Sequence, residues 1–352
     1  MFGLSPDQLA AEAAAYRSKL AAGVNTLAQL DDPRAGATPR DAVYREDKLV
    51  LYRYRPRVAQ PTATPVLIVY ALVNRPDVVD LPADRSMVRG LLEQGMDVYL
   101  IDWGYPDAAD RYLDLDDYIN RYLHHCVTHV RRAHRLTAIN LLGVCQGGAF
   151  SICYAALRPQ YVRNLITMVT PVDFHTPEDR LSQLARAMDV DLTVDTLGNI
   201  PGGLLSAAFM ALRPFQLLGR KYVHAVDRLD DAQALQQFVR MERWIADSPD
   251  QAGEAYRQFV KWLYQENRLV RGRLRIGGKP VRLSELTMPV LNVYATADHL
   301  VPPPAAAALG RHVGSADYRE LAFPTGHIGL YVSRRAQATV APAIATWIQA
   351  RC

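Results

Sequence analysis

One five-residue segment, residues 143–147 (Gly-Val-Cys-Gln-Gly), constrains the fold of this chain more than any other. It follows an apolar run at 138–143 that is typical of a buried strand, and a helical pattern begins at about residue 147. A sharp turn between strand and helix, with glycine on both sides of the central position, is the sequence signature of a nucleophile elbow. The glycines remove side-chain clashes around the strained central residue. The segment therefore predicts an α/β fold in which Cys145 projects from the end of a strand.

The rest of the chain alternates strand and helix patterns, which indicates a mostly parallel sheet with helices on both faces. The continuous apolar run at 65–72 predicts a strand that is buried on both faces, and the alternation at 48–55 suits a strand near an edge. The expected strands are 48–55, 65–72, 97–102, 138–143, 164–170, 289–295 and 317–323. The expected helices of this part are 85–94, 114–133, 147–157 and 334–350.

The strand pattern stops between Thr170 and Met288, where helical segments such as 232–246 and 251–265 are rich in large apolar residues. We interpret this stretch as an inserted helical cap above the end of the sheet. The predicted organisation is therefore an N-terminal helix and connector (1–40), the first part of an α/β core (41–171), the cap (172–285) and the second part of the core (286–352).

The N-terminal segment 5–29 predicts an amphipathic helix. Its apolar residues recur every three or four positions. They are Leu9, Ala13, Tyr16, Leu20, Val24 and Leu27. We expect this stripe to pack against the protein's own core; the alternative is a helix that binds a partner.

Composition excludes several functional classes. The formal net charge of +4 over 352 residues is small, and the basic residues are spread out, so we expect no binding of nucleic acid. The four cysteines form no Cys-x-x-Cys pair and have no zinc-site spacing with histidine, which favours reduced thiols and a cytoplasmic protein without a metal. We find no signal-peptide pattern and no apolar run long enough for a transmembrane helix.

Two further residues complete a candidate catalytic set with Cys145. Asp298 follows the expected strand 289–295, and His327 follows the expected strand 317–323. The chain order of nucleophile, acid and histidine is that of the α/β-hydrolase fold, in which all three lie at the same edge of the sheet. His327 would take the thiol proton and Asp298 would fix its tautomer. The helix after Cys145 would favour the thiolate form.

Backbone N–H groups would hold the negative oxygen that forms when the thiolate attacks a carbonyl. We expect one from Gln146, directly after the nucleophile, and a second from Val73 or Asn74, in the loop after strand 65–72. His299 stands next to Asp298, but we interpret it as a structural histidine. Cys153, two helical turns beyond Cys145, and Cys126 are interpreted as core residues, although a second catalytic thiol at Cys126 stays open.

The use of cysteine favours one class of chemistry. A cysteine that exchanges with a thioester makes another thioester, so the acyl group stays activated and can pass to an alcohol. The sequence therefore favours acyl transfer from a thioester, although hydrolysis stays open.

At these residues the chain resembles the polyhydroxyalkanoate synthases. The resemblance lies in the segment 143–148, the loop 297–303 and the segment 326–329, and it extends over about residues 42–347. The short length and the segments 102–106 and 171–174 resemble the catalytic subunit of the class III, two-subunit enzymes.

This resemblance implies polymerisation of (R)-3-hydroxyacyl-CoA, usually 3-hydroxybutyryl-CoA, into a polyester with release of CoA and without a further cofactor. It also implies an accessory second subunit, a homo-oligomer and association with cytoplasmic polymer granules. Cys145 would carry the acyl group, His327 would be its base, and Asp298 would either orient His327 or help to activate the attacking hydroxyl.

Two other functions stay open. A thioesterase or dienelactone-type hydrolase would use the same triad with water as the acceptor, and a catalytically silent granule scaffold would not need it. We also expect the cap to open, with Gly198, Pro201, Gly202 and Gly203 as hinges; a rigid cap with a permanent channel is the alternative.

Overall fold

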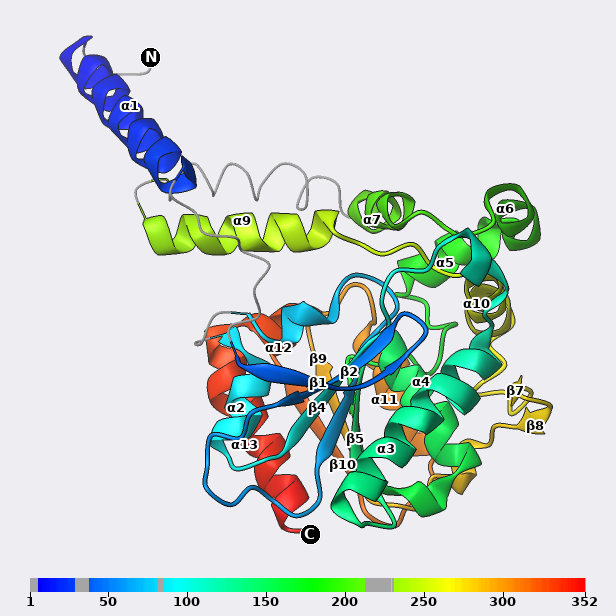
Figure 1. Ribbon diagram of the computed structural model, residues 1–352. Coiled ribbons are helices and arrows are strands. Elements are labelled where there is room, and N and C mark those ends of the chain that lie inside the picture. Colours follow the sequence, from blue (N-terminus) through cyan, green and yellow to red (C-terminus); the bar gives the residue numbers. More distant parts are fainter. Residues whose placement is uncertain (1–5, 29–37, 82–84, 213–228, 230, 352) are drawn as a thin grey trace. The chain divides into compact units, whose positions relative to one another are not determined.

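The computed structural model describes residues 6–28, 38–81, 85–212, 229 and 231–351. At its centre is an eight-stranded sheet (Figure 1). In spatial order its strands are β1 (Arg40–Glu46), β2 (Leu49–Tyr54), β4 (Val98–Asp102), β3 (Val66–Val69), β5 (Ile139–Val144), β6 (Val162–Met168), β9 (Val290–Ala295) and β10 (Tyr318–Phe323). Only β1–β2 and β2–β4 pair antiparallel within this sheet, so the predicted mostly parallel sheet is confirmed.

The strand β1 was not predicted. It lies at the edge of the sheet, and its sequence, Arg-Asp-Ala-Val-Tyr-Arg-Glu, is mostly charged. None of its seven residues is fully buried, which explains why no apolar alternation marks it. As a result the strand expected near an edge, β2, is the second strand of the sheet.

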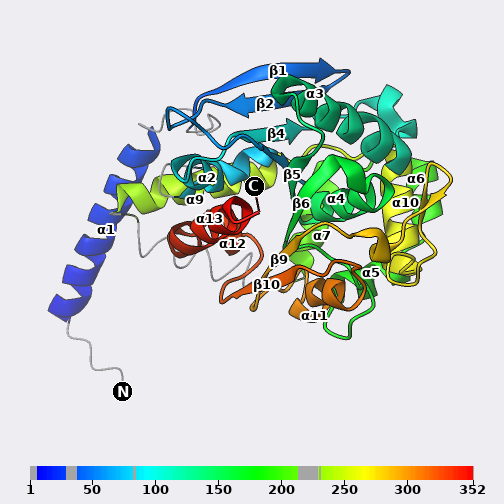
Figure 2. The same ribbon diagram turned by 90° about the horizontal axis from the view of Figure 1, so that it is seen from below.

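Helices cover both faces of the sheet (Figure 2). The helices α2 (Met87–Glu93) and α13 (Arg334–Gln349) pack together on one face. On the other face lie α4 (Gln146–Leu157) and α3 (His124–His134), which continues the π-helical turn η4 (Asp117–Leu123). Shorter helices are η1 (Pro76–Val79), η3 (Ala108–Tyr112), η5 (Pro159–Tyr161), η8 (Leu283–Glu285), α11 (Pro303–Ala307), η9 (Ala308–Arg311) and α12 (Gly329–Val332).

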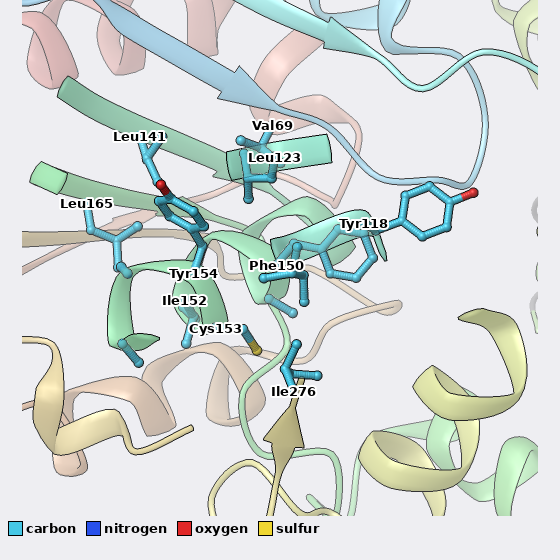
Figure 3. Close-up of a cluster of buried hydrophobic side chains, with 14 of the residues drawn as sticks. Val69, Tyr118, Leu123, Leu141, Phe150, Ile152, Cys153, Tyr154, Leu165 and Ile276 are labelled. Carbon is cyan, nitrogen blue, oxygen red and sulfur yellow. The ribbon is translucent and has the colours of Figure 1, made fainter. Parts of the chain in front are cut away.

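The apolar core fixes α4 against the sheet. All four residues of β3 are buried, and so are the six residues of β5. Phe150, Ile152 and Tyr154 of α4 lie beside strand residues such as Leu141 (Figure 3). Because almost every residue of α4 is buried, the turn that precedes the helix is held from both sides.

Cys126 and Cys153 belong to this core, as predicted, and Cys153 is drawn near Ile276 in Figure 3. Burial raises the pKa of the Cys153 thiol to about 12. Burial also raises the pKa of Cys126, so both thiols stay protonated and unreactive at neutral pH.

The chain divides into two compact units. One unit contains α1 (Pro6–Ala28), α9 (Ala232–Ala246) and most of α7 (Gly202–Ala211), and within it α1 contacts α9. Tyr16, Leu20 and Val24 of the α1 stripe are exposed, and whether the stripe packs on the core stays a prediction. The side chains of Leu9 and Leu27 lie outside the described residues.

The other unit contains the sheet and the remaining helices of the stretch 172–285. These are α5 (Arg180–Ala187), α6 (Val190–Leu197), α10 (Gly253–Phe259) and the π-helical η7 (Val260–Gln265), followed by a small hairpin of β7 (Arg275–Ile276) and β8 (Lys279–Pro280) and by the short η8. The described residues of the stretch are largely helical; the cap and its boundaries stay a prediction. No helix in the described ranges is both long and apolar enough to cross a membrane.

Candidate active site

Cys145 occupies the turn between β5 and α4. Its backbone has φ 54° and ψ −122°, a conformation that costs energy for a residue with a side chain and that recurs at functional sites. Its N–H donates to the carbonyl of Met168 on the neighbouring strand β6, at 2.9 Å. The strained turn thus places a partly exposed thiol at the N-terminus of a buried helix.

The flanking glycines allow this turn because atoms pack closely around them. A Cβ on Gly147 would lie 2.2 Å from the carbonyl oxygen of Val69 in β3, and a Cβ on Gly148 would lie 1.8 Å from Thr170 Oγ1. Neither distance is possible for real atoms without movement of the neighbour. Glycine is therefore required at both positions so that α4 can approach β3 on one side and Thr170 on the other.

Asp298 and His327 lie in loops after β9 and β10 and form a hydrogen-bonded pair. His327 Nδ1 lies 2.7 Å from Asp298 Oδ2, and both side chains are almost completely buried. Asp298 Oδ1 accepts the backbone N–H groups of Leu300 and Val301, at 2.9 and 3.0 Å, so the carboxylate cannot rotate away. His327 also interacts with the side chain of Cys145, whose charge and hydrogen bonding raise the pKa of the imidazole. The structure thus brings the three predicted residues into one chain of contacts.

The surroundings of His327 favour its protonated form. Burial alone would lower its pKa, but the charges of Asp298 and Cys145 and the hydrogen bonds to both raise the pKa of His327 to about 10. A proton that leaves the Cys145 thiol is therefore held on the imidazole at neutral pH. This is the arrangement in which a thiol acts as a nucleophile and the histidine later returns the proton.

The loop at 70–74 approaches the nucleophile from β3 and contains Val73 and Asn74, the predicted second source of an oxyanion N–H. Asn74 has a positive φ of 59°, which turns the backbone sharply after Val73. The N–H of Leu72 donates to the side-chain Oε1 of Gln146, at 2.9 Å. The structure therefore places Gln146, Val73 and Asn74 at the same corner of the fold, and their part in catalysis stays a prediction.

Sequence reasoning missed three tyrosines in this region. Tyr331 lies one helical turn after His327, with the two rings edge to face at 6.4 Å, and its hydroxyl is 3.5 Å from that of Tyr70. Burial, then the charges of Asp179 and Cys145, raises the pKa of Tyr264 well above its ordinary value. A phenol with a raised pKa stays a hydrogen-bond donor at neutral pH. Only the position of Tyr331 beside the Gly-His segment gave a sequence signal.

Tyr264 reaches the site from η7, in the region predicted as a cap. Its ring packs edge to face on Phe174, with 4.8 Å between the centroids, and its carbonyl lies 3.0 Å from His175 Nε2. The π-helical turn around Tyr264 is itself a feature that often occurs at functional sites. A segment predicted as part of the cap therefore contributes a residue near the nucleophile, and the cap itself stays a prediction.

His299, adjacent to Asp298, is partly exposed. Within the described ranges, no group of three or more His, Cys, Asp or Glu side chains is arranged to hold a metal ion.

Comparison with known proteins shows which proteins this chain is similar to. A family model described as the alpha/beta hydrolase fold matches residues 64–333. The chain is 55% identical over 350 residues to the poly(3-hydroxyalkanoate) polymerase subunit PhaC of Allochromatium vinosum, covering 99% of both chains. It is 50% identical over 345 residues to the subunit of the same name from a Synechocystis species, covering 96% of this chain and 91% of that one.

Solved structures support the fold alone. A non-heme bromoperoxidase, BpoC, of Mycobacterium tuberculosis superposes with a TM-score of 0.55 at 14% identity, covering 89% of this chain and 99% of that one. A monoacylglycerol lipase of Paleococcus ferrophilus gives a TM-score of 0.55 at 16% identity, covering 86% and 99%. The predicted α/β-hydrolase fold is confirmed.

Proposed function

This chain belongs to the family of poly(3-hydroxyalkanoate) polymerase PhaC subunits, and on that premise we propose that it polymerises (R)-3-hydroxyacyl-CoA into polyester through a thioester on Cys145. The chain is an acyltransferase, as its relatives are. The observation that carries the proposal is the chain of contacts from Asp298 through His327 to Cys145.

In the first step, His327 accepts the thiol proton and Cys145 Sγ attacks the thioester carbonyl of the substrate. The C–S bond to CoA breaks, and the CoA thiolate takes the proton from His327. The products are a hydroxyacyl thioester on Cys145 and free CoA, and no external cofactor is consumed. The raised pKa of His327 supports this step, because the imidazole holds the proton between its arrival and its departure.

In the second step, a 3-hydroxyl group attacks the acyl carbon on Cys145, and an ester bond replaces the thioester. The hydroxyl proton passes either directly to His327 or first to Asp298, and in both cases it ends on the Asp298–His327 pair. Cys145 is released as the thiolate. Our proposal is that a hydroxyl acceptor, not water, completes the cycle.

We propose further that the protein works with the accessory subunit of a class III synthase on cytoplasmic polymer granules, and as a homo-oligomer. The word subunit in the names of its relatives supports a partner. The accessory subunit would favour an open cap, which requires that it bind the open form more tightly. The division into two units falls between Gly202 and Gly203, within the predicted hinge, and supports this. Hydrogen exchange in residues 172–212 should then change when the accessory subunit is added.

Incubation of the purified protein with 3-hydroxybutyryl-CoA, with and without the accessory subunit, tests the proposed function. We expect release of CoA together with polymer. Release of CoA with only free 3-hydroxybutyric acid would instead favour the thioesterase or dienelactone-type hydrolase. Absence of CoA release in both mixtures would favour the granule scaffold.

A further inference from the structure

The side chain of Gln146 makes a contact that an oxyanion site built from backbone N–H groups does not itself require. Gln146 is the first residue of α4, directly after the nucleophile, and its side chain is 6% exposed. Its Oε1 accepts the N–H of Leu72, at 2.9 Å. Leu72 is itself 6% exposed. The nucleophile turn and the loop after β3 are thus joined by a buried hydrogen bond between residues 74 positions apart.

This hydrogen bond holds the loop where the sheet no longer does. The ladder between β3 and β5 ends at the pair Val69 and Gly143, and the pairing with β4 ends one residue earlier, so Leu72 lies beyond the strand. Farther back, the carbonyl of Tyr70 accepts Trp103 Nε1–H at 2.9 Å. The bond from Leu72 to Gln146 fixes the residue directly before Val73, and on the other side of Asn74 the side chain of Arg75 donates to Asp102 at 2.8 Å.

Geometry makes the position of that loop important. An oxyanion is stabilised only where both donors lie about 2.7–3.1 Å from the position that the oxygen takes. One proposed donor is the N–H of Gln146 itself, and the other comes from Val73 or Asn74. A contact from the side chain of the first donor residue to the residue before Val73 sets the distance between the two donors.

We infer that Gln146 is a positioning residue: its side-chain amide fixes the loop 71–74 to the nucleophile turn, so that the two oxyanion donors stay in register during acyl transfer. This inference rests on the proposed function in one respect, since it takes the reaction to be acyl transfer to Cys145. It does not depend on the identity of the acyl group.

Two reactions of the same thiol separate this role from a merely structural one. Alkylation of Cys145 by iodoacetamide displaces iodide and forms no oxyanion, so it reports the reactivity of the thiol alone. Acylation of Cys145 by a thioester passes through a tetrahedral oxyanion. A loose loop slows the second reaction and leaves the first unchanged, whereas a distorted turn slows both.

The variant is Gln146→Met, which keeps the volume of the side chain and removes the acceptor. Gln258→Met is the matched control. Gln258 lies in α10, and its Oε1 accepts the backbone N–H of another leucine, Leu115, at 3.1 Å. Each protein is treated with iodoacetamide or with phenyl thioacetate, and modification of the Cys145 peptide is followed by mass spectrometry. The thermal unfolding of each variant is measured as well.

We expect Gln146→Met to slow acylation by roughly 10- to 100-fold, since misplacing one donor costs less than the 100- to 1000-fold typical of deleting one. Its alkylation rate, and the pH profile of that rate, should stay within about threefold of the parent. Gln258→Met should leave both reactions within that range. Acylation of Gln146→Met within about threefold of the parent, or an equal fall in both reactions, would overturn the inference.

The same experiment separates this inference from the proposed function. A parent protein that is acylated by phenyl thioacetate but not by 3-hydroxybutyryl-CoA would reject the proposed substrate and leave the role of Gln146 standing. A parent that neither thioester acylates at Cys145 would overturn both.

Discussion

Gly147→Ala is the substitution for which the structure gives the clearest expected cost. The new Cβ would lie 2.2 Å from the carbonyl oxygen of Val69 and 2.5 Å from that of Tyr70. Contacts shorter than 3.0 Å essentially do not occur at a Cβ, so about 1 Å of separation must be created. The opposing atoms are backbone atoms of the last residue of a buried strand and of the buried residue after it, so they cannot rotate away as a side chain could. We therefore place the cost near the upper end of the usual range for overpacking, about 3 kcal/mol.

The same displacement would move α4 away from the loop that follows β3, so acylation of Cys145 should fall even in the fraction that folds. Urea unfolding followed by circular dichroism measures the first effect, and single-turnover acylation measures the second. Gly326→Ala is the stability control, because the nearest atom to its new Cβ would be 3.8 Å away. A Gly147→Ala protein with the urea midpoint and acylation rate of the parent would refute the close approach of α4 to β3.

Three further predictions concern titration and reactivity. Burial raises the pKa of Asp179 from 3.8 to about 6, so the folded protein binds a proton there more tightly than the unfolded chain does. The free energy of unfolding should therefore fall, by up to about 3 kcal/mol, as pH rises from about 4 to 6. Asp179→Asn should flatten that part of a plot of urea midpoint against pH, and a slope that persists would contradict the raised pKa of Asp179. His327→Gln should slow acylation by several orders of magnitude, and Asp298→Asn should slow elongation more than acylation. If Asp298→Asn slowed both steps equally, Asp298 would act only by orienting His327. Cys126→Ser and Cys153→Ser should keep CoA release near that of the parent, and any loss should be matched by a lower unfolding temperature. A loss of turnover in Cys126→Ser without a lower unfolding temperature would point to a second catalytic thiol.

The sheet was largely predictable because its inner strands are continuous apolar runs. β3 and β5 are buried along their whole length, and apolar composition is the signal of burial on both faces. The short helices α5 and α6 were not resolved individually, although each begins with an aspartate cap, Asp179 or Asp189, that accepts a backbone N–H three residues on. A single cap residue is too common to mark a helix by itself, whereas burial on both faces leaves a long pattern.

The triad was predictable for a topological reason. Cys145, Asp298 and His327 each follow a parallel strand, and the carboxyl ends of parallel strands meet at one edge of the sheet. The contact of Gln146 with Leu72 and that of Tyr70 with Tyr331 join residues 74 and 261 positions apart. Neither is marked by a motif or a period, because a side chain's choice of partner depends on how the loops pack in three dimensions.

The stripe of α1 shows the limit of periodicity. Amphipathic spacing predicts that one face of a helix is covered, but it does not say by what. Tyr16, Leu20 and Val24 have the expected spacing, and what covers their face of the helix stays a prediction.

The covalent state of Cys145 during turnover tests the central claim most directly. The protein is mixed with 3-hydroxybutyryl-CoA, quenched with acid and digested. The mass of the peptide that contains Cys145 is then measured and compared with that of the corresponding peptide of Cys145→Ala. We predict that the Cys145 peptide carries one or more hydroxybutyryl units while CoA is released, and that Cys145→Ala is folded, unmodified and inactive. Near-normal CoA release by Cys145→Ala, or turnover in which Cys145 is never acylated, would contradict the account.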